Sequence, residues 1–227
     1  GITPIIQGYW KLIDTALRAS SVHLNDQLFS EFTDHDDWNI SRVMWLAQTW
    51  ETKETTEEFE PLRLVVIQHS VSSECYNFKN CAAEMRILQD YFIKKYKYDI
   101  PYNFLIGNDG RVYEGRGWGI VGAHTRRYNR CALGIGFVGD YREEITAHTS
   151  VSSLQVKRTQ MLLDYGVLKG YLHKDYHILA ARDIQDTASP GSNLYNELQT
   201  WRHYNNGTNY IDKTCEEMYD ITTRYYV

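Results

Sequence analysis

The sequence has no hydrophobic run long enough to cross a membrane. A transmembrane helix needs about 20 consecutive apolar residues, and every apolar stretch of this chain is interrupted well before that length. The chain also does not open with the charged and apolar segments of a secretory signal peptide. We therefore expect the 227 residues to be a mature form or the excised ectodomain of a receptor.

An excess of positive charge is also absent. The chain has 24 Lys and Arg against 29 Asp and Glu, a formal net charge of −5 and a pI near 5.9. Because nucleic-acid-binding domains usually need a basic face, we expect no nucleic-acid partner. The hydrophobic content of 43% is typical of a folded globular protein, and the length suits one domain with added segments.

Cysteine is scarce, with four residues that allow three different pairings. Cys75 and Cys81 are close enough in sequence to close a small loop. The pairing of Cys131 and Cys215 is left open, because Cys131 could equally be a buried thiol. Two glycosylation triplets, at Asn39 and Asn206, add support for an oxidising environment. We expect an extracellular protein, either secreted or the ectodomain of a membrane receptor.

The spacing of apolar residues predicts helices that alternate with strands. Helical periodicity is found before residue 35 and over residues 81–96, 154–168 and 194–201. The almost continuously apolar run Arg63–Gln68 predicts a strand buried on both faces, which we place at the centre of the sheet. Further strands are predicted over residues 132–138 and 176–180. This order predicts an α/β (mixed α+β) fold, with a central, mixed, mainly parallel sheet flanked by three helices and extra N-terminal helices.

The stretch from Pro101 to Asp140 is dense in glycine, arginine and aromatic residues. An apolar run leads into Gly107-Asn108-Asp109-Gly110, and its Asp-Gly step favours positive φ, so a β-hairpin is predicted. The glycine-rich loop that follows supplies hydrogen-bond donors and flat aromatic rings. Gly134 and Gly136 alternate in the next strand, which indicates that something approaches that backbone closely.

Two strings in this stretch, YNFLIGNDGRVYEGRGW and GAHTRRYN, carry a family resemblance. They resemble the core of the peptidoglycan recognition proteins, relatives of the N-acetylmuramoyl-L-alanine amidases that include the bacteriophage amidase-type lysozyme. The resemblance runs from about Ile40 to Tyr204. It implies an amidase-like domain over residues 39–205, between an N-terminal helical extension (1–38) and a C-terminal tail (206–227). It also implies a disulfide between Cys75 and Cys81.

The resemblance breaks down at the metal site. Amidases of this family hold zinc with two histidines and a cysteine and leave the fourth position to water. At the matching positions this chain has Gln68, Ala181 and Ser189, and none of these can replace an imidazole or a thiolate. Tyr102, which matches the tyrosine that assists the catalytic water, is retained. Because all three metal ligands are replaced, we expect no zinc, no other cofactor and no amidase activity.

Two other routes to an enzyme are weaker. His173 and His177 are four residues apart, but the glutamate of an HExxH motif is absent and the segment leads into a strand. Ser70 follows His69, but no GxSxG elbow surrounds it. Adjacent strand residues also point to opposite faces, which places them badly as nucleophile and base.

The resemblance implies an innate-immune pattern-recognition receptor that binds bacterial peptidoglycan fragments without hydrolysing them. Family members that prefer the diaminopimelate type carry an arginine after the YN of GAHTxxYN, and Arg130 stands there. The expected partners are muropeptides and other chains of the receptor family, including a ligand-induced dimer. By motif match, the ligand-binding residues are His69, Tyr102, Arg116, Trp118, His124, Tyr128, Asn129 and Arg130.

Two rival readings stay open. One is a co-receptor or regulatory protein of the same fold that has no ligand-binding groove and acts through protein–protein contact. The other is a residual peptidoglycan hydrolase. Titration with muropeptides separates the first from the receptor, and release of free stem peptide would indicate the second.

Overall fold

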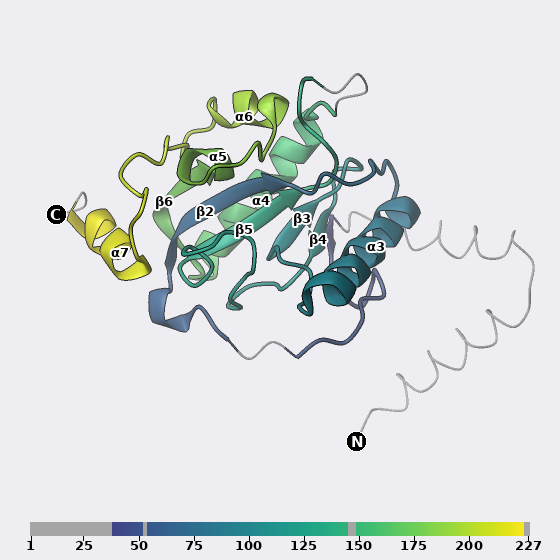
Figure 1. Cartoon of the computed structure of the whole chain (residues 1–227), viewed down its shortest axis with the longest axis horizontal. Coiled ribbons are helices and arrows are strands. Elements are labelled where there is room, and N and C mark those ends of the chain that lie inside the picture. Colours follow the sequence, from purple (N-terminus) through teal and green to yellow (C-terminus); the bar gives the residue numbers. More distant parts are fainter. Residues whose placement is uncertain (1–37, 52–53, 145–148, 225–227) are drawn as a thin grey trace, which may run out of the picture. The chain divides into compact units, whose positions relative to one another are not determined.

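The structure, a computed structural model, describes residues 38–51, 54–144 and 149–224 (Figure 1). The helices predicted before residue 35 lie outside the described residues. Within them, a six-stranded sheet has the order β1-β4-β3-β5-β2-β6. Its strands are β1 (Asn39–Ile40), β2 (Leu62–His69), β3 (Phe104–Ile106), β4 (Val112–Glu114), β5 (Ala132–Phe137) and β6 (Leu172–Ala180).

The sheet is mixed and mainly parallel, which confirms the predicted class. β2 pairs in parallel with β5 and β6, and β5 pairs in parallel with β3. The hairpin β3–β4 is antiparallel, and Gly110 in its turn has a φ of +80°. The predicted place of β2 at the centre was wrong, because it is the fifth of six strands in the sheet. A continuously apolar run shows that both faces of a strand are covered, and this holds for every interior strand of such a sheet. It does not show which interior strand lies at the centre.

Three helices follow the predicted segments closely: α3 (Phe78–Tyr96), α4 (Ser153–Leu168) and α6 (Ser192–Leu198). Three further helical elements were not predicted: η1 (Glu57–Phe59, a 3-10 helix), α5 (Ala181–Ile184) and α7 (Cys215–Arg224). The side chain of Asn77 caps α3 by accepting from the N–H of Asn80, so the helix begins before the predicted Cys81. Ser152 and Gln155 form a capping box at the start of α4.

The two faces of the sheet bury separate apolar clusters. Leu105 and Tyr113 pack with Met85 of α3 on one face. Ile135 of β5 packs with Leu162 of α4 on the other. Figure 1 shows α4 behind the sheet and α3 on the near side, beside β3 and β4. None of the helices among the described residues is both long and apolar enough to span a membrane.

Two disulfides are formed within the described residues. The predicted Cys75–Cys81 bridge is confirmed and lies between β2 and α3. A second bridge joins Cys131, just before β5, to Cys215 at the start of α7. Met218 of α7 is fully buried. Part of the segment predicted as a tail is therefore packed against the sheet.

Candidate ligand-binding site

The candidate site lies over β5 and β2, toward the carboxyl ends of these parallel strands, where α/β sheets usually bind ligands. Gly134 and Gly136 leave room there for two rings. A Cβ atom added to Gly134 would lie 2.2 Å from the ring of His124, and one added to Gly136 would lie 2.8 Å from the ring of Tyr102. The prediction that something approaches this backbone closely is confirmed: the rings of His124 and Tyr102 lie directly on it.

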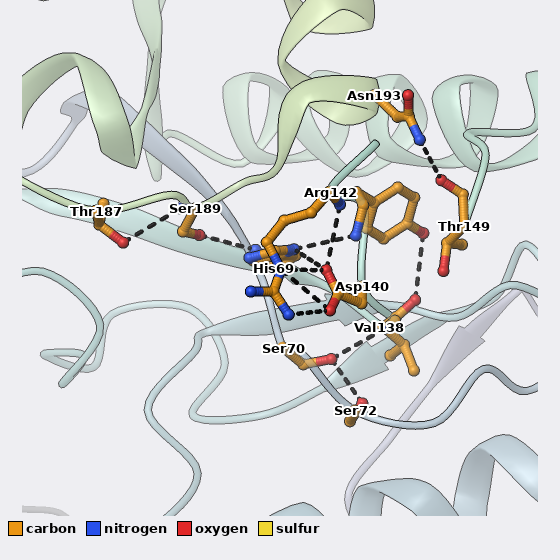
Figure 2. Close-up of polar contacts among 12 residues, drawn as sticks. His69, Ser70, Ser72, Val138, Asp140, Arg142, Thr149, Thr187, Ser189 and Asn193 are labelled. Carbon is orange, nitrogen blue, oxygen red and sulfur yellow. Dashed lines mark hydrogen bonds and ion pairs between the residues drawn. The ribbon is translucent and has the colours of Figure 1, made fainter. Parts of the chain in front are cut away.

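The three positions that the resemblance matches to the family's metal ligands, 68, 181 and 189, come together at the ends of β2 and β6. Ile67 pairs with Ala180, so the next residues, Gln68 and Ala181, lie side by side. The hydroxyl of Ser189 accepts a hydrogen bond from the backbone N–H of His69 at 3.1 Å (Figure 2). Strand register and this one hydrogen bond therefore gather residues that are far apart in sequence.

Polar groups at these three positions are used within the protein. The side-chain amide of Gln68 donates to the backbone oxygen of His124 at 2.9 Å, and Thr125 Oγ1 lies 3.4 Å from the same nitrogen. The methyl group of Ala181 is fully buried and offers no donor atom. Across the part of the chain that the structure describes, no group of three or more His, Cys, Asp or Glu residues is arranged to hold a metal ion.

His69 closes β2 and belongs to a polar network that the sequence did not predict (Figure 2). Its Nδ1 accepts a hydrogen bond from the N–H of Tyr141 at 3.2 Å, so the neutral ring carries its proton on Nε2. Burial lowers the pKa of His69 to about 4, although Asp140, 3.8 Å away, acts in the opposite direction. Arg142 hydrogen-bonds to Asp140 at 2.6 Å, which lowers the pKa of that carboxyl. The only signal in the sequence is an aspartate just beyond the end of a parallel strand.

Tyr102, His124 and Asn129 are the other predicted residues that the structure brings to this site. The hydroxyl of Tyr102 donates to the backbone oxygen of His69 at 3.3 Å, and burial raises its pKa. Burial also lowers the pKa of His124 to about 4, so this imidazole is neutral at pH 7. Asn129 Oδ1 accepts from the N–H of Thr125 at 2.7 Å and fixes the turn that carries His124.

Arg116 and Trp118 contribute to the framework of the domain. The guanidinium of Arg116 donates to the backbone oxygens of residues 99, 100 and 121 at 3.0–3.2 Å. The indole of Trp118 stacks on Tyr171 with ring centroids 5.1 Å apart, and it lies against Gly166 of α4. Both side chains are therefore occupied within the domain.

Tyr128 and Arg130 also have partners within the protein. Tyr128 is buried, and its hydroxyl donates to the backbone oxygen of Tyr210 at 2.6 Å. Arg130 is half-exposed, forms an ion pair with Glu58 of η1 and lies 3.6 Å from a carboxylate oxygen of Glu216 in α7. Its guanidinium therefore faces carboxylates of this chain, and the predicted pairing with a ligand carboxylate stays a prediction.

Two surface hollows lie outside this group of residues. One, of about 370 Å³, is lined by Ser150, Val151, Asn193, Asn196 and Glu197. The other, of about 200 Å³, lies beside β6. Neither is lined by a predicted ligand-binding residue.

Comparison with known proteins assigns the family. The profile of the N-acetylmuramoyl-L-alanine amidase family matches residues 58–192. Peptidoglycan-recognition protein SA of Drosophila melanogaster is 43% identical over 148 residues, which is 65% of this chain and 70% of that protein. The chain belongs to the peptidoglycan recognition protein family. The amidase-like fold that the motifs predicted is therefore confirmed.

Solved structures of peptidoglycan recognition proteins agree with this assignment. One is the ectodomain complex of proteins LCa and LCx with tracheal cytotoxin, with a TM-score of 0.68, 33% identity, and coverage of 74% of this chain and 98% of that one. Another is protein LE with the same ligand, a monomeric diaminopimelic acid-type peptidoglycan, with a TM-score of 0.67, 37% identity, and coverage of 74% and 95%. The similar chains are named as recognition proteins, although the family profile is that of an amidase.

Proposed function

We propose that this peptidoglycan recognition protein is an innate-immune receptor that binds peptidoglycan fragments and does not hydrolyse them. One contrast carries the proposal. His124 and Tyr102 still lie over the glycines of β5, whereas the three zinc-ligand positions hold Gln68, Ala181 and Ser189. Related structures hold tracheal cytotoxin, so muropeptide is the ligand class that the fold supports best.

The substitutions remove each contribution that zinc would make to hydrolysis. Zinc hydrolases use the metal to lower the pKa of a bound water and to polarise the substrate carbonyl. A carboxamide, a methyl group and a neutral hydroxyl supply neither the charge nor the softness that zinc prefers in its ligands. The amide of Gln68 is also occupied as a donor to His124.

The residues that remain are suited to binding. The rings of Tyr102 and His124 can pack against sugar and peptide faces, and the hydroxyl of Tyr102, which donates to His69, can still accept a hydrogen bond from a ligand. Both ring nitrogens of His124 are bonded within the domain, to Thr125 Oγ1 at 2.9 Å and to the backbone oxygen of Ala132 at 3.3 Å, so its ring offers a neutral flat face. Asn129 keeps the turn in place through its bond to Thr125. This combination of flat apolar surface with a few polar groups is typical of small-molecule sites.

We also propose a preference for diaminopimelate muropeptides, read by Arg130. The diaminopimelate residue carries one carboxylate more than lysine at its side-chain end, and an arginine fork can bind a carboxylate with two parallel hydrogen bonds. Arg130 is paired with Glu58 on the surface. A ligand carboxylate would have to displace Glu58, and exposed ion pairs are weak enough, at about 0–1 kcal/mol, to be displaced.

Titration calorimetry with a purified diaminopimelate muropeptide tests the binding site. Tyr102→Phe and His124→Phe retain the ring over β5 and remove its polar group. Tyr102→Phe should weaken binding by about 1 kcal/mol, or roughly fivefold, the usual size of one hydrogen bond. His124→Phe loses the two bonds that orient the ring and should weaken binding as well. Tyr165→Phe, at an exposed position of α4, is the matched control and should not change the affinity. Equal effects of all three substitutions would place the ligand elsewhere.

A second candidate, a co-receptor that acts through protein contact, is favoured by one surface. Val43 and Leu46 expose 81% and 60% of their surface, and Ile87 on α3 exposes 60%. The guanidinium of Arg86 donates to the backbone oxygen of Trp45 at 2.9 Å, which holds the two segments together. Exposed apolar patches of this kind often mark protein interfaces.

Sedimentation with a second family chain, with and without muropeptide, distinguishes the two candidates. A receptor binds muropeptide in the calorimeter without a second protein. A co-receptor gives no heat alone but joins a complex with a relative that already holds the ligand, and Leu46→Asp with Ile87→Asp should abolish that complex.

We further propose an extracellular location. Two disulfides are formed within the described residues, and such bridges persist mainly in oxidising compartments. Asn39 and Asn206, the predicted glycosylation sites, are both exposed. Expression through a secretory pathway followed by glycosidase treatment tests this location. The glycosidase should lower the mass of the wild-type protein and should leave the mass of the double variant Asn39→Gln with Asn206→Gln unchanged.

A further inference from the structure

The C-terminal segment of the domain, residues 207–219, lies against the loop that carries His124 and Asn129. This loop, residues 124–131, leads into β5. The segment belongs to the part predicted as a tail, yet it runs into α7, whose Met218 is fully buried. Three pairs of residues join the segment to the second half of the loop, so the loop is supported by residues far from it in sequence.

The first pair is the disulfide between Cys131 and Cys215. Cys131 is the last residue before β5, and both cysteine side chains are buried. Nearby, the hydroxyl of Tyr219 donates to the backbone oxygen of Cys131 at 3.2 Å and accepts from the N–H of Arg63 in β2, also at 3.2 Å. The start of α7 is thus fixed both to the end of the loop and to the sheet.

The second pair, Tyr128 and Tyr210, is buried in the interior. The hydroxyl of Tyr128 donates to the backbone oxygen of Tyr210 at 2.6 Å. The hydroxyl of Tyr210 is in turn bonded to Nδ1 of His177 in β6. Because a buried hydroxyl needs a hydrogen-bond partner, its bond allows Tyr128 few other positions. The middle of the loop is therefore connected to β6 through the C-terminal segment.

The third pair, Arg127 and Asp212, shows that the loop backbone is strained. Both are non-glycine residues with a positive φ, of +74° and +59°. L-residues disfavour this conformation, and it persists only where the surrounding contacts enforce it. Aspartate adopts it more readily than arginine does, so the larger strain lies at Arg127. The two side chains form an ion pair at 3.0 Å, but both are exposed, so the pair alone is a weak restraint.

The strained residue lies between the two residues of the loop that we assign to ligand binding. Asn129 Oδ1 accepts from the N–H of Thr125 at 2.7 Å, and the N–H of Tyr128 donates to the backbone oxygen of Thr125 at 3.0 Å. A change of φ at Arg127 would redirect the chain between these bonded residues and separate Asn129 from Thr125. The turn that carries His124 therefore depends on the backbone conformation of Arg127.

We propose that the C-terminal segment positions the muropeptide-binding loop, with Tyr210, Asp212 and Cys215 as its positioning residues. Their role is to keep Arg127 in its strained conformation, and through it the turn of His124. The inference rests on the proposed receptor function for its effect on affinity, but not for its effect on the loop. Loss of these contacts should let the loop relax, so the affinity for muropeptide falls while the sheet stays folded.

Hydrogen exchange of amide protons tests the inference without any ligand. Asp212→Ala removes one of the three contacts and should speed exchange at Thr125 and Tyr128 by roughly threefold, the scale of an exposed ion pair. Asp90→Ala breaks an exposed ion pair with Lys94 on α3 and is the matched control, which should leave both rates unchanged. Equal rates at Thr125 and Tyr128 in the wild type and in Asp212→Ala would overturn the proposal.

Glycine at position 127 separates positioning from general stability. Cys131→Ala with Cys215→Ala removes the bridge, so the affinity for a diaminopimelate muropeptide should fall roughly tenfold, the scale of one strained residue that relaxes. Adding Arg127→Gly should restore most of that affinity, because glycine adopts a positive φ without strain. It should recover little of the stability lost with the bridge, since that loss arises mainly in the unfolded chain.

The outcomes of these experiments distinguish the inference from the receptor function. A bridge-free variant that binds as tightly as the wild type, or an affinity loss that Arg127→Gly does not restore, would overturn the positioning role. A wild type that binds no muropeptide refutes the receptor function instead, and exchange at Thr125 then decides whether the segment holds the loop. Circular dichroism checks that the bridge-free variant is folded, and Asp212→Ala gives the exchange test if it is not.

Discussion

The side-chain amide of Gln68 donates a hydrogen bond to the backbone oxygen of His124, 2.9 Å away. The residue at the first zinc-ligand position thus joins the end of β2 to the loop that carries a predicted ligand-binding ring. By the family resemblance, this position binds metal in an amidase. In this chain its side chain instead fixes the loop of His124 in place.

Restoring the three ligands should restore zinc binding. Strand register places residues 68 and 181 side by side, and Ser189 Oγ is bonded to the backbone at position 69. We predict that Gln68→His with Ala181→His and Ser189→Cys binds about one zinc per chain after dialysis, because two imidazoles and a thiolate form a catalytic-type site. Elemental analysis measures the metal. Ser189→Cys alone is the control and should bind none, and stoichiometric zinc in the wild type would contradict the account.

A matched pair of substitutions tests the role of Arg130. Arg130→Ala should weaken binding of a diaminopimelate muropeptide by about 1.5–3 kcal/mol, the range for a hydrogen bond to a charged group. Glu58→Gln removes the carboxylate that now pairs with Arg130, and it should strengthen the same binding. Calorimetry with lysine-type muropeptide should show little change for either variant. Parallel changes for both ligand types would mean that Arg130 does not read the third stem residue.

Stability should fall as the solution becomes acidic. His69 and His124 have a pKa of about 4 in the folded protein against 6.5 as the ordinary value. Between these values the unfolded chain holds protons that the folded chain lacks, so stability is full above 6.5 and is lost as the pH falls. Each histidine contributes a slope of about 1.4 kcal/mol per pH unit in this window.

Urea unfolding between about pH 6.5 and pH 5 measures that slope. His69→Asn keeps an acceptor for the N–H of Tyr141 and cannot be protonated. The slope of its free energy of unfolding against pH should therefore be smaller than that of the wild type by the contribution of one histidine. A slope identical to that of the wild type would show that His69 is protonated in the folded state.

The two disulfides should differ in what they contribute. In the chain-entropy treatment a longer closed loop gives more stabilisation. The Cys131–Cys215 bridge spans 84 residues and Cys75–Cys81 spans 6. Replacing both cysteines of the long bridge by serine should lower the free energy of unfolding by about 4–5 kcal/mol, against about 2 for the short bridge. Urea unfolding of the two double variants compares them, and a larger loss for the short bridge would contradict the prediction.

The sequence predicted the elements of the fold because their signals are local. Helical spacing, the Asp-Gly turn and the apolar run of β2 each depend on neighbouring residues. The order of the strands and the Cys131–Cys215 bridge depend on contacts between distant segments, so periodicity could not supply them. For the same reason the start of α3 was missed: the cap at Asn77 lies outside the apolar pattern.

The residues of the candidate site were chosen by motif match. The structure groups four of them together, His69, Tyr102, His124 and Asn129, and their role in binding stays a prediction. It also selected Arg116, Trp118 and Tyr128, whose polar or aromatic groups are used inside the domain. A sequence motif shows that a donor or an aromatic ring is present. It does not show whether that group already has a partner inside the protein.

One measurement tests the central claim most directly. Calorimetric titration of the wild-type protein with a defined diaminopimelate muropeptide should give saturable binding at one site per chain. The ligand recovered from the cell after long incubation should have its original mass, because the lactyl amide bond stays intact without zinc. No binding heat, or recovery of free stem peptide that chelators suppress, would contradict the account.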